Sequence, residues 1–317
     1  MTGTGTQADP YIILTADDLY EIGTVGGTTA YFRLDADIDF NETAYAESFS
    51  PITLKCAELD GNGHTIRNIY YTNQAGCANV FTSCSRYDAP WSMTVKNLKM
   101  ENIYLNGAIT YFLYSPSDFE DCPIVFSNCS IACSFKPSTL LANSNYTYKG
   151  FMSDGNRYIE ASYCTFVITA ENAGPHPLFY RGSLNCCHIN VNFDILETAE
   201  SLYNREAFFR SVNMTDVAIF GKIRSKTDKE SSKWLFSADG THSNVYQVME
   251  YENIDTAYWN SLISTVCFYD SEVKGDRVNI TNNNTSYYPQ NIHGLTTAQC
   301  KSAEYLKSIG FLCEGAE

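Results

Sequence analysis

Residues 52–71 read Ile-Thr-Leu-Lys-Cys-Ala-Glu-Leu-Asp-Gly-Asn-Gly-His-Thr-Ile-Arg-Asn-Ile-Tyr-Tyr. Two alternating runs place apolar side chains on one face: Ile52, Leu54 and Cys56 in the first, Ile66 and Ile69 in the second. Asp60-Gly61-Asn62-Gly63 lies between them and is a strong turn signal, because glycine adopts a positive φ without a clash. The stretch therefore predicts a strand, a sharp structural turn with Gly61 at positive φ, and a second strand. A chain coiled through many such rungs is a parallel β-helix.

The segment Leu59–Ile69 resembles the LDGNGHTIKNL rung of right-handed β-helix proteins with GLUG-like repeats. Residues 3–12 and 32–39 are similar to the opening of the same family, and residues 295–311 resemble the ending of its members. The combination looks most like virion structural proteins of tailed phages that infect gut Gram-positive bacteria. The resemblance implies a tail fibre, a spike or another surface appendage of a phage particle.

We therefore expect an all-β chain, folded as a right-handed single-stranded parallel β-helix (a solenoid) with short N- and C-terminal capping helices. Residues 1–30 form the N-terminal lead and capping helix, residues 31–275 the parallel β-helix, and residues 276–317 a polar loop and a C-terminal helix. Thr15 is placed as the N-cap of a helix at 16–23. Thr296 begins a capping box for a helix at about 297–309, which is either a cap or a docking element.

Later rungs are visible from the phase of alternation. Four runs begin with a small buried-type residue, and their first members are Cys129, Cys164, Cys187 and Val217. These are 35, 23 and 30 residues apart, whereas a rung needs about 20–25 residues, so the excess is expected in loops. The expected loops are residues 143–157, 171–178 and 224–233.

Bulk composition excludes several classes of protein. The net charge of −15 disfavours binding to nucleic acid, whose phosphates an acidic surface repels. No apolar run approaches the ~20 residues of a membrane helix, and no secretory leader is visible, so we expect folding in the host cytoplasm and residence in the virion, without a membrane partner. The 12 Cys include no C-x-x-C pair, and we expect reduced, buried thiols with no zinc or other cofactor.

Two polar rows have both a ligand-binding and a structural interpretation. Asp35, Asp37 and Asp39 are expected to share one strand face, which suggests Ca²⁺, but a solvated face is the simpler interpretation because a strand spaces these carboxylates too widely. Asparagine also precedes an apolar residue repeatedly, at Asn68, Asn97, Asn102 and Asn128. Such asparagines stack at β-helix corners and bond neighbouring backbone, and a sugar-binding row is the functional alternative.

Aromatic residues supply the ligand-binding candidates. Exposed Tyr and Trp bind sugars by stacking, although each one taken alone is more simply a packing residue. The residues expected to bind a ligand are Tyr258, Trp259, Tyr287, Tyr288 and Trp234. Because the chain is acidic and its basic residues are dispersed, the expected glycan is neutral.

Catalysis is the main alternative, since β-helices also host polysaccharide hydrolases and lyases. Asp194, Asp216 and Glu250 are the candidate carboxylates on successive rungs, but no acid–base pair is recognisable, and the five His have no orienting partner in the sequence. We therefore expect a non-catalytic virion protein for host attachment and receptor binding. A bacterial surface adhesin is a second alternative, disfavoured by the missing secretion signal. The expected partners are other virion proteins, with a host-surface glycan and a homotrimer left open.

Overall fold

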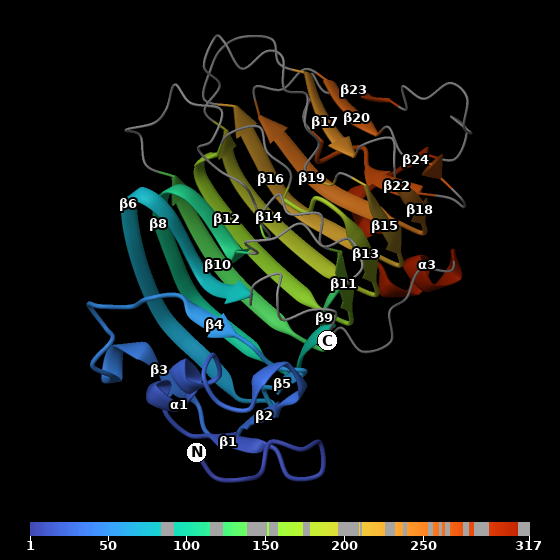
Figure 1. Ribbon diagram of the computed structural model, residues 1–317. Coiled ribbons are helices and arrows are strands. Elements are labelled where there is room, and N and C mark those ends of the chain that lie inside the picture. The colour runs from blue at the N-terminus through green and yellow to red at the C-terminus, as the bar shows by residue number, and fades with distance from the viewer. Residues whose placement is uncertain are drawn as a thin grey trace.

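The computed structural model describes residues 1–83, 92–114, 123–137, 151, 158–173, 178–195, 209, 211–225, 232–236, 240–252, 256–259, 262–263, 267–274, 279–281 and 292–309. Within these residues, every pairing between named strands is parallel, and apart from β1 with β2, no two paired strands are consecutive in the chain. Each rung therefore contributes a strand to each of two long sheets before the chain moves to the next rung (Figure 1). The expectation of an all-β parallel β-helix is confirmed.

The ten-stranded sheet, called sheet A, contains β1 (Tyr11–Ile13), β2 (Tyr31–Leu34), β5 (Glu58–Asp60), β7 (Met93–Lys96), β9 (Ile124–Ser127), β11 (Ile159–Ser162), β13 (Gly182–Asn185), β15 (Val212–Thr215), β18 (Thr241–Ser243) and β21 (Leu262–Ile263). The eleven-stranded sheet, called sheet B, contains β3 (Ile38–Asp39), β4 (Ile52–Leu54), β6 (Thr65–Ser83), β8 (Lys99–Tyr114), β10 (Ser130–Pro137), β12 (Thr165–Ala173), β14 (His188–Ile195), β16 (Ala218–Ser225), β19 (Tyr246–Glu252), β22 (Cys267–Asp270) and β24 (Ile292–Leu295). A third sheet, called sheet C, contains β17 (Ser232–Phe236), β20 (Thr256–Trp259) and β23 (Asn279–Thr281).

The helices are short: α1 (Ala16–Glu21), α2 (Thr297–Cys300) and α3 (Ala303–Ser308), with 3₁₀ turns at Gly27–Thr29 and Phe40–Glu42. Both expected caps are present, because Thr15 and Thr296 each form a capping box with the residue three positions later. The single C-terminal helix expected at 297–309 is two helices, since the chain leaves the helix at Lys301 and Ser302 caps the next one. Among the described residues, no helix is long and apolar enough to span a membrane.

The corner between sheet A and sheet B follows a common pattern in seven successive rungs, although the first corner, at residues 61–64, is two residues longer than the next one. One residue per rung adopts the left-handed conformation, with φ between 49° and 56°: Asn62, Asn97, Asn128, Tyr163, Cys186, Asp216 and Asn244. In the five corners from Asn97 to Asp216, the backbone N–H of this residue donates to a carbonyl of the next rung, as from Asn128 to the Ser162 carbonyl at 3.0 Å. Asparagine suits this position because it tolerates left-handed φ, which confirms the corner role expected for Asn97 and Asn128.

The residue after each of the next corners turns inward, so Cys129, Cys164, Cys187 and Val217 occupy equivalent buried positions directly before β10, β12, β14 and β16. The rung phase expected from their spacing is confirmed.

Gly61 requires a correction. Its φ is not positive; Asn62 and Gly63 carry the positive φ values, 51° and 81°. Glycine is needed at position 61 for a different reason, because a Cβ there would lie 2.5 Å from both the Asn97 carbonyl oxygen and Leu98 Cα. The backbone of the next rung passes directly against this residue.

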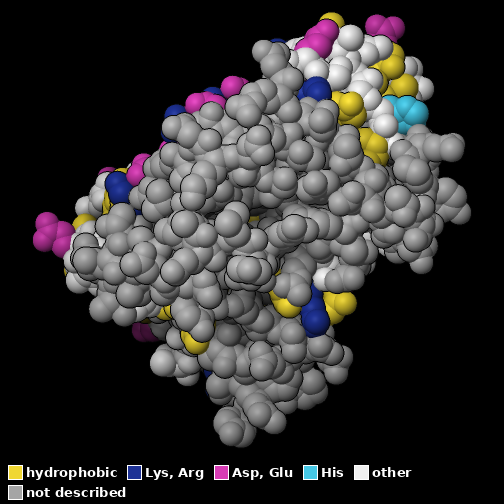
Figure 2. Space-filling model, turned by 90° about the horizontal axis from the view of Figure 1, so that it is seen from above, with side chains coloured by type: hydrophobic (Ala, Val, Ile, Leu, Met, Phe, Trp, Pro, Cys, Tyr) yellow, Lys and Arg dark blue, Asp and Glu magenta, His cyan; other side chains and the backbone are white. Residues whose placement is uncertain are grey.

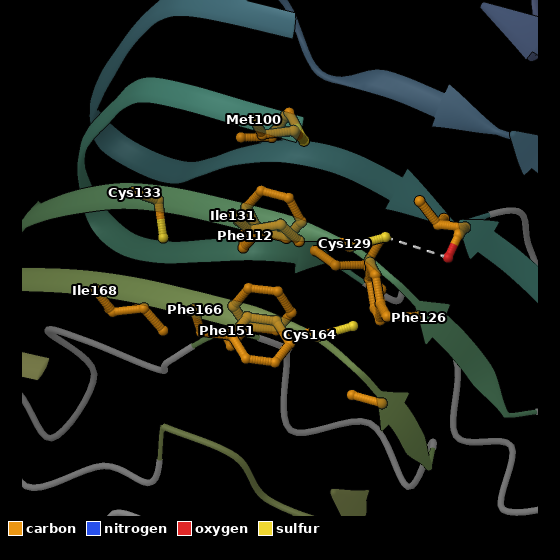
Figure 3. Close-up of a cluster of buried hydrophobic side chains, with 14 of the residues drawn as sticks. Met100, Phe112, Phe126, Cys129, Ile131, Cys133, Phe151, Cys164, Phe166 and Ile168 are labelled. Carbon is orange, nitrogen blue, oxygen red and sulfur yellow. Dashed lines mark hydrogen bonds between the residues drawn. The ribbon is translucent and has the colours of Figure 1, made fainter. Parts of the chain in front are cut away.

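The core runs without interruption from the first rungs to Cys267. Aromatic rings stack through its centre: the Phe112 and Phe151 rings lie 4.6 Å apart and parallel, and the Phe166 ring contacts Phe151 edge-on (Figure 3). The nine described cysteines are thiols, and seven of them are buried, as Cys129, Cys133 and Cys164 are in Figure 3. Cys84, Cys122 and Cys313 lie outside the described residues.

The acidic row of the first rungs is also corrected. Asp35 and Asp37 lie in the corner between β2 and β3, so the three carboxylates do not share one strand. Asp35 forms a two-bond ion pair with Arg33 (2.8 and 2.9 Å), and Asp39 accepts from Arg67 Nε at 2.9 Å. Asp37 accepts from the backbone of Thr65 in the next rung at 3.0 Å. These acids connect the first rungs to one another.

Candidate functional site

A groove of about 540 Å³ follows the corner between sheets A and B along the axis of the β-helix. It crosses five rungs, and its lining consists of Gly63, Asn97, Lys99, Asn128, Cys129, Ser130, Tyr163, Cys164, Thr165 and His188. These residues come from the corners, from the residues directly after the corner positions, and from the first residue of the sheet B strands that follow. We call it the corner groove.

One side of the corner groove is a ladder of side-chain amides. Asn128 Nδ2 donates to Asn97 Oδ1 at 2.9 Å, and Asn97 Nδ2 donates to Asp60 Oδ1 at 3.0 Å. The same Asp60 oxygen accepts from the Asn62 backbone at 2.8 Å, which fixes the start of the ladder. The amides are thus held in one orientation, and preorganised polar groups lose little entropy when they bind a ligand.

The other side is a row of side chains that begin successive strands of sheet B. Strand register places Lys99, Ser130, Thr165 and His188 side by side on β8, β10, β12 and β14. Neighbouring strands lie about 4.8 Å apart, so this row extends for about 14 Å. The hydroxyl groups of Ser130 and Thr165 lie in the middle of this row, with the Lys99 ammonium at one end and the His188 imidazole at the other.

Tyr163 breaks the pattern of the corner positions. It adopts φ 55° although it is neither glycine nor asparagine, and its side chain is 55% exposed. An aromatic residue in the left-handed region costs free energy relative to asparagine, of order 1 kcal/mol. The corner therefore carries an exposed ring where the local backbone favours the residue found at Asn97 and Asn128. Strain of this kind is more common at functional sites.

The electrostatics of the corner groove differ from those of the whole chain. No carboxylate is among the residues described in its lining. Lys99 is exposed, and its ammonium forms no ion pair with another described residue. Burial lowers the pKa of His188, which keeps its imidazole neutral at pH 7.

Elsewhere, several basic side chains are paired with carboxylates. On the outer face of sheet B, Lys136 pairs with Glu171 at 3.1 Å, and Figure 2 shows acidic and basic side chains next to each other along one edge of the molecule.

The structure only partly places the aromatic residues expected to bind a ligand. In sheet C, Trp234 of β17 is opposite Tyr258 of β20, and Trp259 is opposite Phe236. Three of the five residues are thus on two adjacent strands, in a sheet separate from the corner groove. Tyr287 and Tyr288 lie outside the described residues. This expected site remains a prediction.

The three carboxylates considered for catalysis lie on different strands or corners, and two of them are held in ion pairs. Asp194 is held by Arg224 through two bonds of 2.9 and 2.8 Å, and Glu250 by Lys222 at 3.1 Å. Strand register separates the backbones of Asp194 and Glu250 by about 12 Å, and Asp216 lies at a corner roughly 20 Å along the strand from Asp194. Glycoside hydrolysis needs two carboxyl groups within about 9.5 Å of each other.

The histidines are dispersed as well. His188 faces outward into the corner groove, as its strand phase predicts, and His242 is fully buried on β18. His64 corrects the expectation that none has an orienting partner, because its Nδ1 lies 3.1 Å from Asp37. His293 is exposed on β24, and His176 lies outside the described residues.

Sequence reasoning considered the asparagine row but did not find the corner groove. Tyr163, Ser130 and Thr165 carry no motif, and they meet only because rungs of unequal length align at their corners. The available signal was the residue before each buried Cys, since Asn128 and Tyr163 both hold that place.

No family model matches the chain, and no curated protein matches it. A solved structure titled "putative immunoglobulin A1 protease" from Bacteroides ovatus is similar to it at 15% sequence identity and a TM-score of 0.47. The match covers 97% of the present chain and 88% of that chain. At this level of similarity, the solved structure indicates nothing about the activity of the present chain.

Proposed function

We propose that the chain is a non-catalytic attachment protein that binds a host-surface glycan in the corner groove. The observation that carries the proposal is the lining itself, whose described residues supply oriented amides, hydroxyls and one exposed ring but no carboxylate. Sugars present alternating hydroxyl groups and apolar ring faces, and fixed hydrogen-bonding groups beside an aromatic platform match both.

We propose that the chain performs this binding on a phage particle, of which it forms a fibre, a spike or another surface appendage. The support is the resemblance of Leu59–Ile69 and of the chain's opening to β-helical virion proteins. The long, stacked core also suits an appendage, because a solenoid is rigid along its axis and presents side chains at a fixed spacing.

Catalysis is the less favoured function. The carboxylates Asp194 and Glu250 are both held in ion pairs, and a carboxylate in an ion pair is a poor general acid because a nearby cation stabilises its charged form. Among the described residues that line the corner groove, none is an acid that could protonate a leaving oxygen. A ligand held there would be bound and released unchanged.

Substitution of Tyr163 tests this proposal directly. The variant Tyr163→Asn removes the ring and places asparagine at a left-handed position, as in the neighbouring rungs. We expect the free energy of unfolding to increase by about 1 kcal/mol, because asparagine relieves the backbone strain of the corner. Binding to host cell-wall and capsular glycans should weaken about tenfold, the equivalent of ~1.4 kcal/mol. Equilibrium urea unfolding and a glycan-binding assay measure the two effects.

Tyr158 provides the matched control. It precedes β11, the strand that ends before Tyr163, and is also exposed, at 41%, but it does not line the corner groove. Tyr158→Asn should bind glycans like the unmodified chain. Equal loss of binding in both variants, or undiminished binding in Tyr163→Asn, would remove the corner groove as the glycan site.

A further inference from the structure

The row of residues that forms one side of the corner groove continues beyond His188. Strand register extends it through Ala218 of β16, Tyr246 of β19 and Phe268 of β22. All three side chains are buried, in contrast to Lys99 at the other end of the row. The groove therefore stops at His188 because something covers the next rungs.

The cover is the pair of C-terminal helices. Leu295 and Cys300 form a buried apolar cluster with these residues, and Tyr305, Leu306 and Ile309 pack around it. Tyr246 Oη donates to the Cys300 carbonyl at 2.5 Å, and Thr297 is bonded to Asp270 and Glu272 at the end of sheet B. In Figure 1, α3 lies beside the later rungs, near the start of their sheet B strands.

The two ends of the groove thus differ. At the covered end, His188 contacts Phe220 edge-on with ring centroids 6.2 Å apart, and Phe220 packs against the helical cluster. At the other end, Gly63 has no side chain, and a Cβ placed there would meet no atom within 4 Å. A linear ligand can leave the groove past Gly63 but not past His188.

We propose that the corner groove recognises the end of a linear glycan chain and does not bind the chain's interior. This inference rests on the proposed glycan binding and specifies which part of the polymer is bound. The row from Lys99 to His188 covers about 14 Å, which accommodates only a few sugar units. The terminal unit would lie at His188, against the wall formed by Phe220 and the helices, and the rest of the chain would extend past Gly63.

The test varies the number of chain ends at constant mass. Host cell-wall glycan is used intact and after sonication to shorter chains, and the amount of bound protein is measured per milligram of glycan. End recognition predicts that binding rises in proportion to the number of ends, so that tenfold shorter chains bind about tenfold more protein. Equal binding per milligram would overturn end recognition while leaving glycan binding intact. No binding to either preparation would overturn the proposed function itself.

Removing the wall provides a second measurement. Leu306→Asp places a charge in the helical cluster and should detach α3 from sheet B, which exposes the covered continuation of the groove. Intact glycan should then bind nearly as well per milligram as sonicated glycan. The matched control is Lys307→Asp, because Lys307 is the neighbouring exposed residue of α3. If Leu306→Asp keeps the dependence on chain ends while circular dichroism shows an intact β fold, the helices are not the wall.

Discussion

Gly61→Val is expected to abolish stable folding of the chain. Even the Cβ of alanine would lie 2.5 Å from the Asn97 carbonyl oxygen and from Leu98 Cα, and valine adds two further carbons. The Gly61 N–H also donates to the Lys96 carbonyl at 2.7 Å, so the two rungs cannot separate without losing this bond. We expect Gly61→Ala to lower the free energy of unfolding by about 4 kcal/mol or more, and Gly61→Val to leave little folded protein. Denaturant unfolding followed by circular dichroism measures both.

The neighbouring glycine separates a steric effect from a conformational one. Gly63 has φ 81° but open space around its Cβ position, so Gly63→Ala meets only the backbone preference. Its cost should be about 1 kcal/mol. Comparable losses from Gly61→Ala and Gly63→Ala would show that the close contact between rungs is not where the structure places it.

Acid should destabilise the chain through His242. This residue is 1% exposed, and burial lowers the pKa of its imidazole from about 6.5 to about 3. In the unfolded chain the same group binds a proton near pH 6.5, so the unfolded state binds more protons below that pH. The contribution of the buried neutral imidazole to the free energy of unfolding is therefore fully present above about pH 7 and is lost as the pH decreases toward 3. Between pH 7 and pH 5 the loss is about 2 kcal/mol.

His242→Asn isolates this effect, because asparagine keeps a polar side chain but does not titrate. The variant should be less stable at pH 7, yet its free energy of unfolding should change by about 2 kcal/mol less than that of the unmodified chain between pH 7 and pH 5. Asp18, Asp37 and Asp39, whose carboxyl pKa values lie below their usual range, destabilise the fold only at lower pH. An unchanged slope in His242→Asn would show that this imidazole is not buried.

The fold could be predicted because its determinants are local and repeated. The turn at 60–63 encodes one corner. Later corners share no sequence with it, but each is marked by the run of alternating buried residues that follows it, such as the run that begins at Cys129 after Asn128. The error at Gly61 has a physical origin, since a turn motif shows that glycine is needed but not whether conformation or contact requires it. The contact is with Asn97 and Leu98, and only their register reveals it.

The corner groove was harder to predict because no single rung contains it. Lys99, Ser130, Thr165 and His188 are separated by loops of unequal length, and their alignment depends on strand register. The wall at the end of the corner groove is formed by the C-terminal helices, which lie more than a hundred residues after His188 in the sequence and pack against Tyr246 through Cys300. The aromatic pairs of sheet C were chosen by residue type alone, which identifies platforms for stacking but not the groups that orient a ligand beside them.

The most direct test of the proposed function is one incubation with two readouts. Purified protein is mixed with host cell-wall and capsular glycans, and bound protein and released reducing ends are measured together. We expect binding that depends on Tyr163, with no release of reducing ends above the buffer control. Release that is abolished by substituting a single carboxylate, such as Asp194 or Glu250, would contradict non-catalytic attachment and identify the chain as a glycan-degrading enzyme.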